Sequence, residues 1–216
     1  MILVMYLSVA IASVPEGLEP AVSPADAPEQ YRAFTKENGS KQTLACDPLW
    51  TGEALLCFRV RDAAGARWVT DADLVAWSVT IADLRADVTR RAVEHLDLLQ
   101  KTDVSPNQSY WRATASDGWE AAGVLAPAAL AERLGGEVLA AVPAQGLGVY
   151  WLAGDAELDH IIGVGVRDLY EDAEGSVSPT LYRWNGSRWQ AYATARKTDP
   201  KPLPPATVEP KQGRAP

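Results

Sequence analysis

Short apolar stretches, alternating or continuous and bounded by turn residues, predict a series of strands along the chain. We expect them at residues 42–45, 54–60, 67–70, 109–114, 138–142, 147–152, 181–184 and 187–192. The last two flank Asn185-Gly186, the dipeptide that most strongly favours a hairpin. A two-residue turn there would place Tyr182 opposite Trp189.

Apolar positions three or four residues apart predict helices between these strands. The longest runs from Thr80, which forms a capping pair with Asp83, to about Gln100. Other helices are expected at residues 26–38, 71–77, 127–134 and 155–170. Because strands and helices do not alternate regularly, the pattern predicts an α+β fold, with a mostly antiparallel sheet and helices packed on it. The order strand, turn, strand, helix occurs twice, at residues 57–99 and 138–170, which would fit two ββα-like units.

The two ends of the chain differ in composition from its middle. Residues 1–12 are apolar apart from Ser8 and end in Ala10-Ile11-Ala12, the pattern that precedes signal-peptidase cleavage. They predict a signal peptide too short to span a bilayer; the absence of a preceding Lys or Arg leaves a buried N-terminal strand as the alternative. Residues 13–27 contain three prolines and predict a linker with little structure of its own. Residues 28–195 are expected to form one domain.

The tail, residues 196–216, contains six prolines, five basic residues and two acidic residues. It has too few large apolar residues to bury, which predicts a disordered tail.

Cys46 and Cys57 are the only cysteines, and a turn-rich stretch between two predicted strands separates them. A hairpin would bring the sulfur atoms within bonding distance, and in an oxidising compartment they would form a disulfide. The alternative is a pair of small buried apolar side chains. Zinc is not expected, because two cysteines without a nearby histidine make at most half a site.

Charge excludes some partners. The chain has 28 acidic and 20 basic residues and a net charge of -8. This charge opposes binding to nucleic acid and to anionic lipid. After cleavage of the signal peptide, we also expect no stable insertion of the protein in a membrane.

Catalytic motifs are absent from the sequence: it has no nucleophile elbow, no Walker loop and no zinc-protease helix. A histidine mechanism would have to use His95 or His160, the only two histidines. We therefore predict no catalytic residue, no metal ligand and no cofactor. A cryptic hydrolase remains an alternative if His95 or His160 meets Asp117 and Glu120 in one pocket.

Several motifs occur in the order seen in the YtpQ-like family, a group of bacterial domains of unknown function. They are Arg67-Trp68-Val69-Thr70, Ala92-Val93-Glu94-His95-Leu96, Tyr110-Trp111-Arg112, Asp117-Gly118-Trp119-Glu120, Leu139-Ala140-Ala141-Val142-Pro143 and Val177-Ser178-Pro179. Residues 55–193 resemble this family, which implies no known activity and members that are mostly not exported. Arg112, Asp117 and Trp119 lie in these motifs and are our candidate binding residues.

Three classes of function follow. The first is a non-enzymatic domain, exported to the periplasm or the extracellular space, that binds another envelope protein; a toxin-neutralising immunity protein is one form of it. The second is a glycan or peptidoglycan binder, suggested by eight tryptophans. The third is the cryptic hydrolase.

Overall fold

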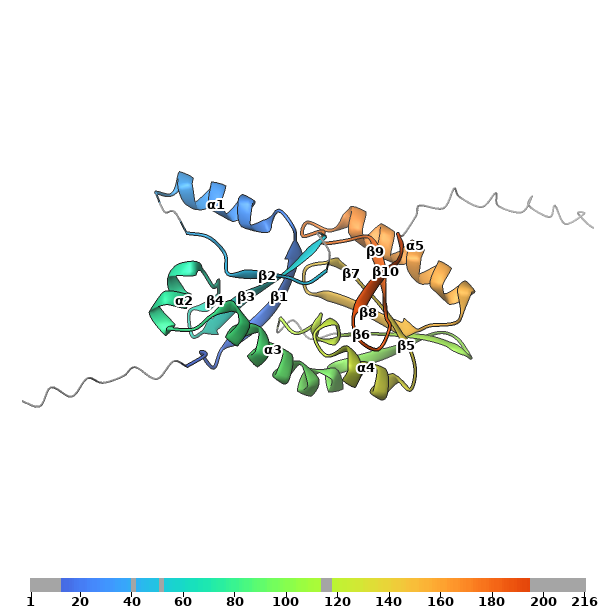
Figure 1. Cartoon of the computed structure of the whole chain (residues 1–216). Coiled ribbons are helices and arrows are strands. Elements are labelled where there is room, and N and C mark those ends of the chain that lie inside the picture. The colour runs from blue at the N-terminus through green and yellow to red at the C-terminus, as the bar shows by residue number, and fades with distance from the viewer. Residues whose placement is uncertain (1–12, 40–41, 51–52, 114–117, 195–216) are drawn as a thin grey trace, which may run out of the picture.

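The computed structural model describes residues 13–39, 42–50, 53–113 and 118–194 (Figure 1). The predicted signal peptide and tail lie outside these residues. The helices are α1 (Ala27–Glu37), α2 (Asp71–Trp77), α3 (Ile81–His95), α4 (Pro127–Leu134) and α5 (Ala156–Asp172), with short 3₁₀ turns η1 (Leu96–Leu98) and η2 (Ala122–Val124). The strands are β1 (Leu18–Pro24), β2 (Cys46–Pro48), β3 (Ala54–Asp62), β4 (Gly65–Trp68), β5 (Leu99–Ser105), β6 (Gln108–Ala113), β7 (Val138–Ala144), β8 (Leu147–Leu152), β9 (Thr180–Trp184) and β10 (Trp189–Thr194). The α+β prediction is confirmed.

The strands form two antiparallel sheets rather than one. In the first sheet β3 is central: it pairs with β1 on one side and with β2 and β4 on the other. The second sheet has the order β10-β9-β7-β8-β6-β5. The two predicted ββα-like units correspond to β3–β4 followed by α2 and α3, and to β7–β8 followed by α5, so each lies in a different sheet.

Strand β1 corrects the prediction of an unstructured linker at residues 13–27. It pairs with β3 over its whole length, and Leu18 and Val22 are buried in the core. Its prolines are tolerated because β1 is an edge strand, where a missing N–H breaks no ladder on the open side. The buried carboxylate of Glu19 forms ion pairs with Arg59 and Arg61 of β3.

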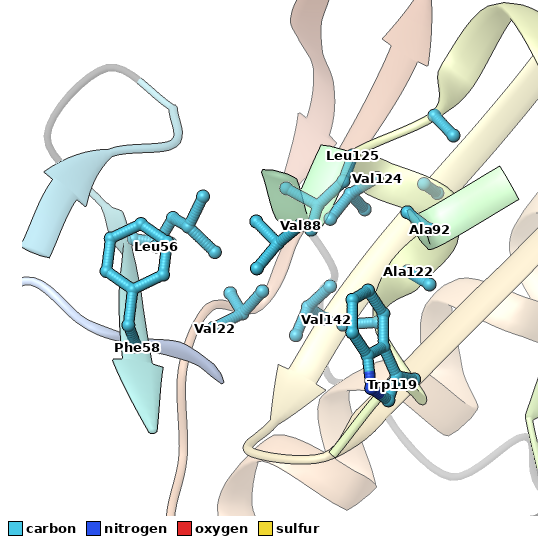
Figure 2. Packing of buried hydrophobic residues seen from close by; sticks show 14 of the residues in the cluster. Val22, Leu56, Phe58, Val88, Ala92, Trp119, Ala122, Val124, Leu125 and Val142 are labelled. Carbon is cyan, nitrogen blue, oxygen red and sulfur yellow. The ribbon is translucent and has the colours of Figure 1, made fainter. Parts of the chain in front are cut away.

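One hydrophobic cluster joins the two sheets. It combines Leu56 and Phe58 of β3 with Val142 of β7 and with Val88 of α3 (Figure 2). A second, smaller cluster lies on the opposite face of the six-stranded sheet, where α5 covers β7. Strands β7 and β8 of the six-stranded sheet are therefore buried on both faces, and α3 packs against β1, β2 and η2.

The helix caps agree with the predictions for α3 and α5. The amide of Asp83 donates to Thr80 Oγ1 at 3.2 Å, and the amide of Thr80 donates back to Asp83 Oδ2 at 2.8 Å. The Asp155 carboxylate accepts hydrogen bonds from the first-turn amides of α5.

The predicted helix to Gln100 is too long. Helix α3 ends at His95, and the chain enters β5, which forms a hairpin with β6 through Pro106 and Asn107. The apolar spacing continues through Leu96, which is buried in the following 3₁₀ turn, so periodicity alone conceals the end of the helix.

The disulfide prediction is confirmed: Cys46 and Cys57 are bonded. The two residues face each other directly in the register of β2 and β3, with their Cα atoms 4.1 Å apart. Among the described residues there is no free cysteine. The bond indicates an oxidising compartment.

Candidate functional site

A groove of about 790 Å³ opens where the first sheet, α3 and the β9–β10 hairpin meet. Its walls come from segments far apart in sequence. They are the loop after β2 (Pro48, Leu49, Trp50), α3 (Arg85), η2 and the start of α4 (Val124, Leu125, Pro127), and the hairpin (Tyr182, Trp184, Ser187, Arg188, Trp189, Gln190, Ala191). The volume is typical of ligand-binding pockets.

The hairpin wall is held by an asparagine turn. Asn185 Oδ1 accepts from the amides of Ser187 and Arg188, at 3.0 and 2.9 Å. The connection is therefore four residues long, and Trp184 rather than Tyr182 pairs with Trp189. The predicted hairpin is confirmed and its predicted register is wrong, because the side chain of the Asn supplies the turn's hydrogen bonds instead of a two-residue turn.

This register places two tryptophans side by side on the groove wall. The ring centres of Trp184 and Trp189 are 5.7 Å apart at an angle of 59°, and both side chains are partly exposed. Trp189 Nε1 donates to the carbonyl of Val124 at 2.9 Å, which ties the hairpin to η2. The Asn185 turn and the hydrogen bond from Trp189 thus both hold this wall in place.

A stacked aromatic pair forms another part of the groove. Trp50 lies on Tyr182 with ring centres 3.8 Å apart. The Tyr182 hydroxyl donates to Glu53 Oε2 at 2.6 Å, and Ser178 Oγ donates to the same oxygen at 2.9 Å. Burial raises the pKa of Tyr182, and the hydrogen bond to Glu53 raises it further. Burial alone would raise the pKa of Glu53, but hydrogen bonds from Tyr182, Thr180 and Ser178 outweigh it and lower this pKa. Tyr182 therefore stays protonated and Glu53 ionised near neutral pH.

The indole N–H of Trp50 has no hydrogen-bond partner among the described residues. Trp50 is only 6% exposed, and it lines the groove. Leaving a buried donor unsatisfied costs about 1–3 kcal/mol. The nitrogen atom itself is buried, so here the fold tolerates this cost.

Two arginines add positive charge to the groove. Arg85 forms an ion pair with Asp47, and its Nη1 also donates to the carbonyl of Pro48 at 3.1 Å. Arg188 is exposed at the hairpin turn, and in the described part of the chain its guanidinium has no ion pair. The groove thus combines aromatic surface with Arg188, an exposed cation that has no ion pair among the described residues.

Two of the three predicted binding residues, Arg112 and Trp119, lie on opposite faces of the six-stranded sheet. Arg112 is exposed on β6, two residues after Tyr110, and so shares the face of the sheet that α5 covers. Trp119 belongs to the cluster on the other face and is 6% exposed (Figure 2). Asp117 lies outside the described residues.

Trp119 has structural contacts in this position. Its ring stacks on His95 at 4.1 Å, and the guanidinium of Arg91 lies 5.1 Å from the ring centre. These residues are one turn apart on α3, so Trp119 attaches the segment before η2 to that helix.

A smaller polar pocket of about 300 Å³ lies beside the predicted motif around Trp119. Arg59, Arg61, Glu120 and Gln145 contribute its polar groups. Both arginines share the one carboxylate of Glu19, which offsets one of their two charges, and Glu120 adds a second acidic group to the pocket.

The hydrolase alternative needs histidine and carboxylate in one pocket. His95 packs on Trp119 in the cluster between the sheets, whereas His160 is exposed on α5, on the opposite face of the six-stranded sheet. Over the described ranges, no group of three or more His, Cys, Asp or Glu side chains is arranged to hold a metal ion.

Neither a family model, nor a curated protein, nor a solved structure matches this chain. The resemblance to the YtpQ-like family stays a prediction. Within the part of the chain that the structure describes, no helix has the length and apolar character needed to cross a membrane.

Proposed function

We propose that this protein is a non-enzymatic binding protein of an extracytoplasmic compartment, and that the aromatic groove binds another protein. The observation that carries the proposal is the gathering of four aromatic residues and Arg188 around one hollow: Trp50, Tyr182, Trp184 and Trp189. Within the described residues Arg188 has no ion pair. Trp, Tyr and Arg are the residues that most often dominate binding energy at protein interfaces.

The compartment is inferred from two features. The disulfide forms and persists in oxidising surroundings, and the apolar residues 1–12 have the composition of a signal peptide. An immunity protein that blocks a secreted toxin is one member of this class, since it needs a groove or face but no catalytic group.

Differential capture tests the proposal. The mature protein, Trp184→Ala and Trp77→Ala are each immobilised and exposed to an envelope extract of the producing cell. Trp77 is a matched control, because it is also partly buried against the main cluster but does not line the groove. We expect a protein that binds to wild type and to Trp77→Ala but is lost with Trp184→Ala. Identical profiles on all three proteins would overturn the proposal.

A glycan is the second candidate ligand. Trp184 and Trp189 are partly exposed side by side, and aromatic faces of this kind pack against the apolar faces of sugar rings. Co-sedimentation with insoluble peptidoglycan distinguishes the two candidate ligands. Sedimentation of the wild-type protein that Trp184→Ala abolishes would favour the glycan. Wild-type protein that stays in the supernatant would favour the protein partner.

A further inference from the structure

A small apolar hollow lies between α5 and the β5–β6 hairpin, on the face of the six-stranded sheet that is opposite the aromatic groove. Its volume is about 200 Å³, and its walls are apolar or aromatic, among them Val104, Tyr110, Ile161 and Leu169. A cavity of about 150 Å³ holds one benzene molecule. The hollow is therefore large enough for one branched aliphatic side chain.

The rim of the hollow consists of exposed apolar residues. Val104, Ile161 and Leu169 are three of the large apolar side chains that the described part of the chain exposes. Gly165 lies between the last two on α5, and a Cβ added there would meet no neighbouring atom of the described residues within 4 Å. Glycine weakens a helix, and here no close contact requires it. The hollow therefore extends to the backbone of α5.

The outer face of α5 is acidic on both sides of this apolar stretch. Residues three or four apart share one face of a helix. The residues on this face are Glu157, Ile161, Gly165, Asp168 and Asp172. The three carboxylates form no ion pair within the described residues, and Arg167, the one arginine of α5, is paired with Glu171. A segment that binds here should be apolar at its centre and basic beside it.

The tail of this chain, which lies outside the described residues, has that composition. Leu203 stands between Pro202 and Pro204, and Lys197 and Lys201 precede it. With five basic and two acidic residues, the tail has a net charge of +3, whereas the whole chain has -8. Prolines favour an extended polyproline II conformation, so such a segment loses little conformational entropy when it binds.

The tail also begins beside α5. Strand β10 ends at Thr194, and Tyr192 in the same strand donates to Asp159 of α5 at 2.8 Å. Four strand spacings, about 19 Å, separate β10 from β6 in the order of the sheet. Leu203 follows Thr194 by nine residues, which span about 30 Å when extended. The tail can therefore cross the outer face of α5 and bring Leu203 to the hollow.

We propose that the tail binds to α5 of its own chain, with Leu203 in the apolar hollow and with Lys197 and Lys201 beside the carboxylates of the helix. The inference does not depend on the proposed function, because the aromatic groove lies on the other face of the sheet. The composition of the tail predicts no fold of its own, and α5 supplies the apolar surface that the tail lacks.

Methyl NMR of the whole protein tests this. The Ile, Leu and Val methyl groups are labelled with ¹³C, and the signals of Leu203 are identified by their loss in Leu203→Ala. We expect nuclear Overhauser effects between the methyl groups of Leu203 and those of Ile161 and Leu169.

Filling the hollow should release the tail. Gly165→Leu places a side chain in the hollow and suits a helix better than glycine does. Ala128→Leu is the matched control, because Ala128 is exposed on α4, which packs on the other face of the sheet. We expect the Overhauser effects from Leu203 to disappear in Gly165→Leu and to persist in Ala128→Leu.

The charges on α5 have their own test. Asp168→Lys should weaken the binding of the tail about threefold, the effect of losing one exposed ion pair. The bound fraction is measured from the chemical shift of the Leu203 methyl groups, with Gly165→Leu as the unbound reference. Glu132→Lys makes the same charge change at an exposed position on α4, and it should leave the bound fraction unchanged.

Three results would overturn the inference. The first is a wild-type protein without Overhauser effects between Leu203 and α5. The second is a set of effects that appear only between differently labelled molecules in a mixed sample, which would make a second copy the occupant of the hollow. The third is a bound fraction that Asp168→Lys and Glu132→Lys lower equally, which would contradict the pairing of the basic residues with α5.

Discussion

Breaking the disulfide should lower the stability of this protein by an amount that follows from the chain length it closes. Cys46 and Cys57 are 11 residues apart and join neighbouring strands β2 and β3. A cross-link of this span removes about 9 cal/mol/K of entropy from the unfolded chain, or about 3 kcal/mol at 25 °C. For a domain of this size the loss corresponds to a fall in Tm of roughly 6–12 °C.

Urea unfolding of three samples separates the cross-link from packing. They are the oxidised protein, the same protein reduced with a phosphine, and the variant Cys46→Ala/Cys57→Ala. Reduction keeps both sulfur atoms in place, whereas alanine also removes the fully buried sulfur of Cys57. We expect stability to fall in that order, with a larger m-value after reduction because the open unfolded chain exposes more surface.

Oxidised and reduced proteins that differ by less than about 0.5 kcal/mol would refute this reasoning. Such a result would mean that residual pairing of β2 with β3 restrains the unfolded chain as strongly as the covalent bond does.

Other predictions concern the cap, the helix packing and the pH dependence. Thr80→Ala removes the hydroxyl that caps α3 and should cost about 1 kcal/mol in thermal melts, while an unchanged melt would contradict the capping role. Gly165→Ala adds a methyl group in open space within α5 and should raise the free energy of unfolding by up to about 1 kcal/mol. Gly123→Ala would place the new Cβ 2.6 Å from the buried ring of Tyr150 and should lower it. Urea titrations that give the reverse order would disprove this packing. Because folding lowers the pKa of Glu53, ionised Glu53 stabilises the fold above its ordinary pKa of 4.5, and this stabilisation is lost as the pH falls below that value. The difference in free energy of unfolding between wild type and Tyr182→Phe should therefore narrow below pH 4.5. A gap that stays constant from neutral pH into this range would show that the hydrogen bond does not carry the difference.

Local signals in the sequence predicted much of the secondary structure. The capping residues Thr80 and Asp155 mark the helix starts, and Asn185 marks the last hairpin, because each acts through hydrogen bonds to its own neighbours. Cys46 and Cys57 could be paired because no other cysteine competes.

Two edge strands could not be predicted in this way. Strand β1 contains Pro20 and Pro24, which disfavour a central strand, and only its pairing with β3 explains its burial. Strand β5 is mostly polar and follows a helical apolar stripe that ends in Leu96 and Leu99. In both cases tertiary pairing overrides the local pattern.

The groove was missed for a related reason. Its aromatic residues come from two separate segments, with Trp50 after β2 and Trp184 and Trp189 in the β9–β10 hairpin, and its first arginine comes from α3. No periodicity along the chain links these positions. The predicted binding residue Trp119, by contrast, was chosen from a local motif and is part of the core.

Site-specific photo-cross-linking in the producing cell tests the central claim most directly. Benzoylphenylalanine is placed at Gln190, which is exposed and lines the groove, and at Arg112 on the opposite face as the control. The account predicts a discrete protein adduct from position 190 that Trp184→Ala abolishes, and no such adduct from position 112. Adducts from position 112 alone would place the binding surface on the α5 side of the sheet and contradict the groove as the site.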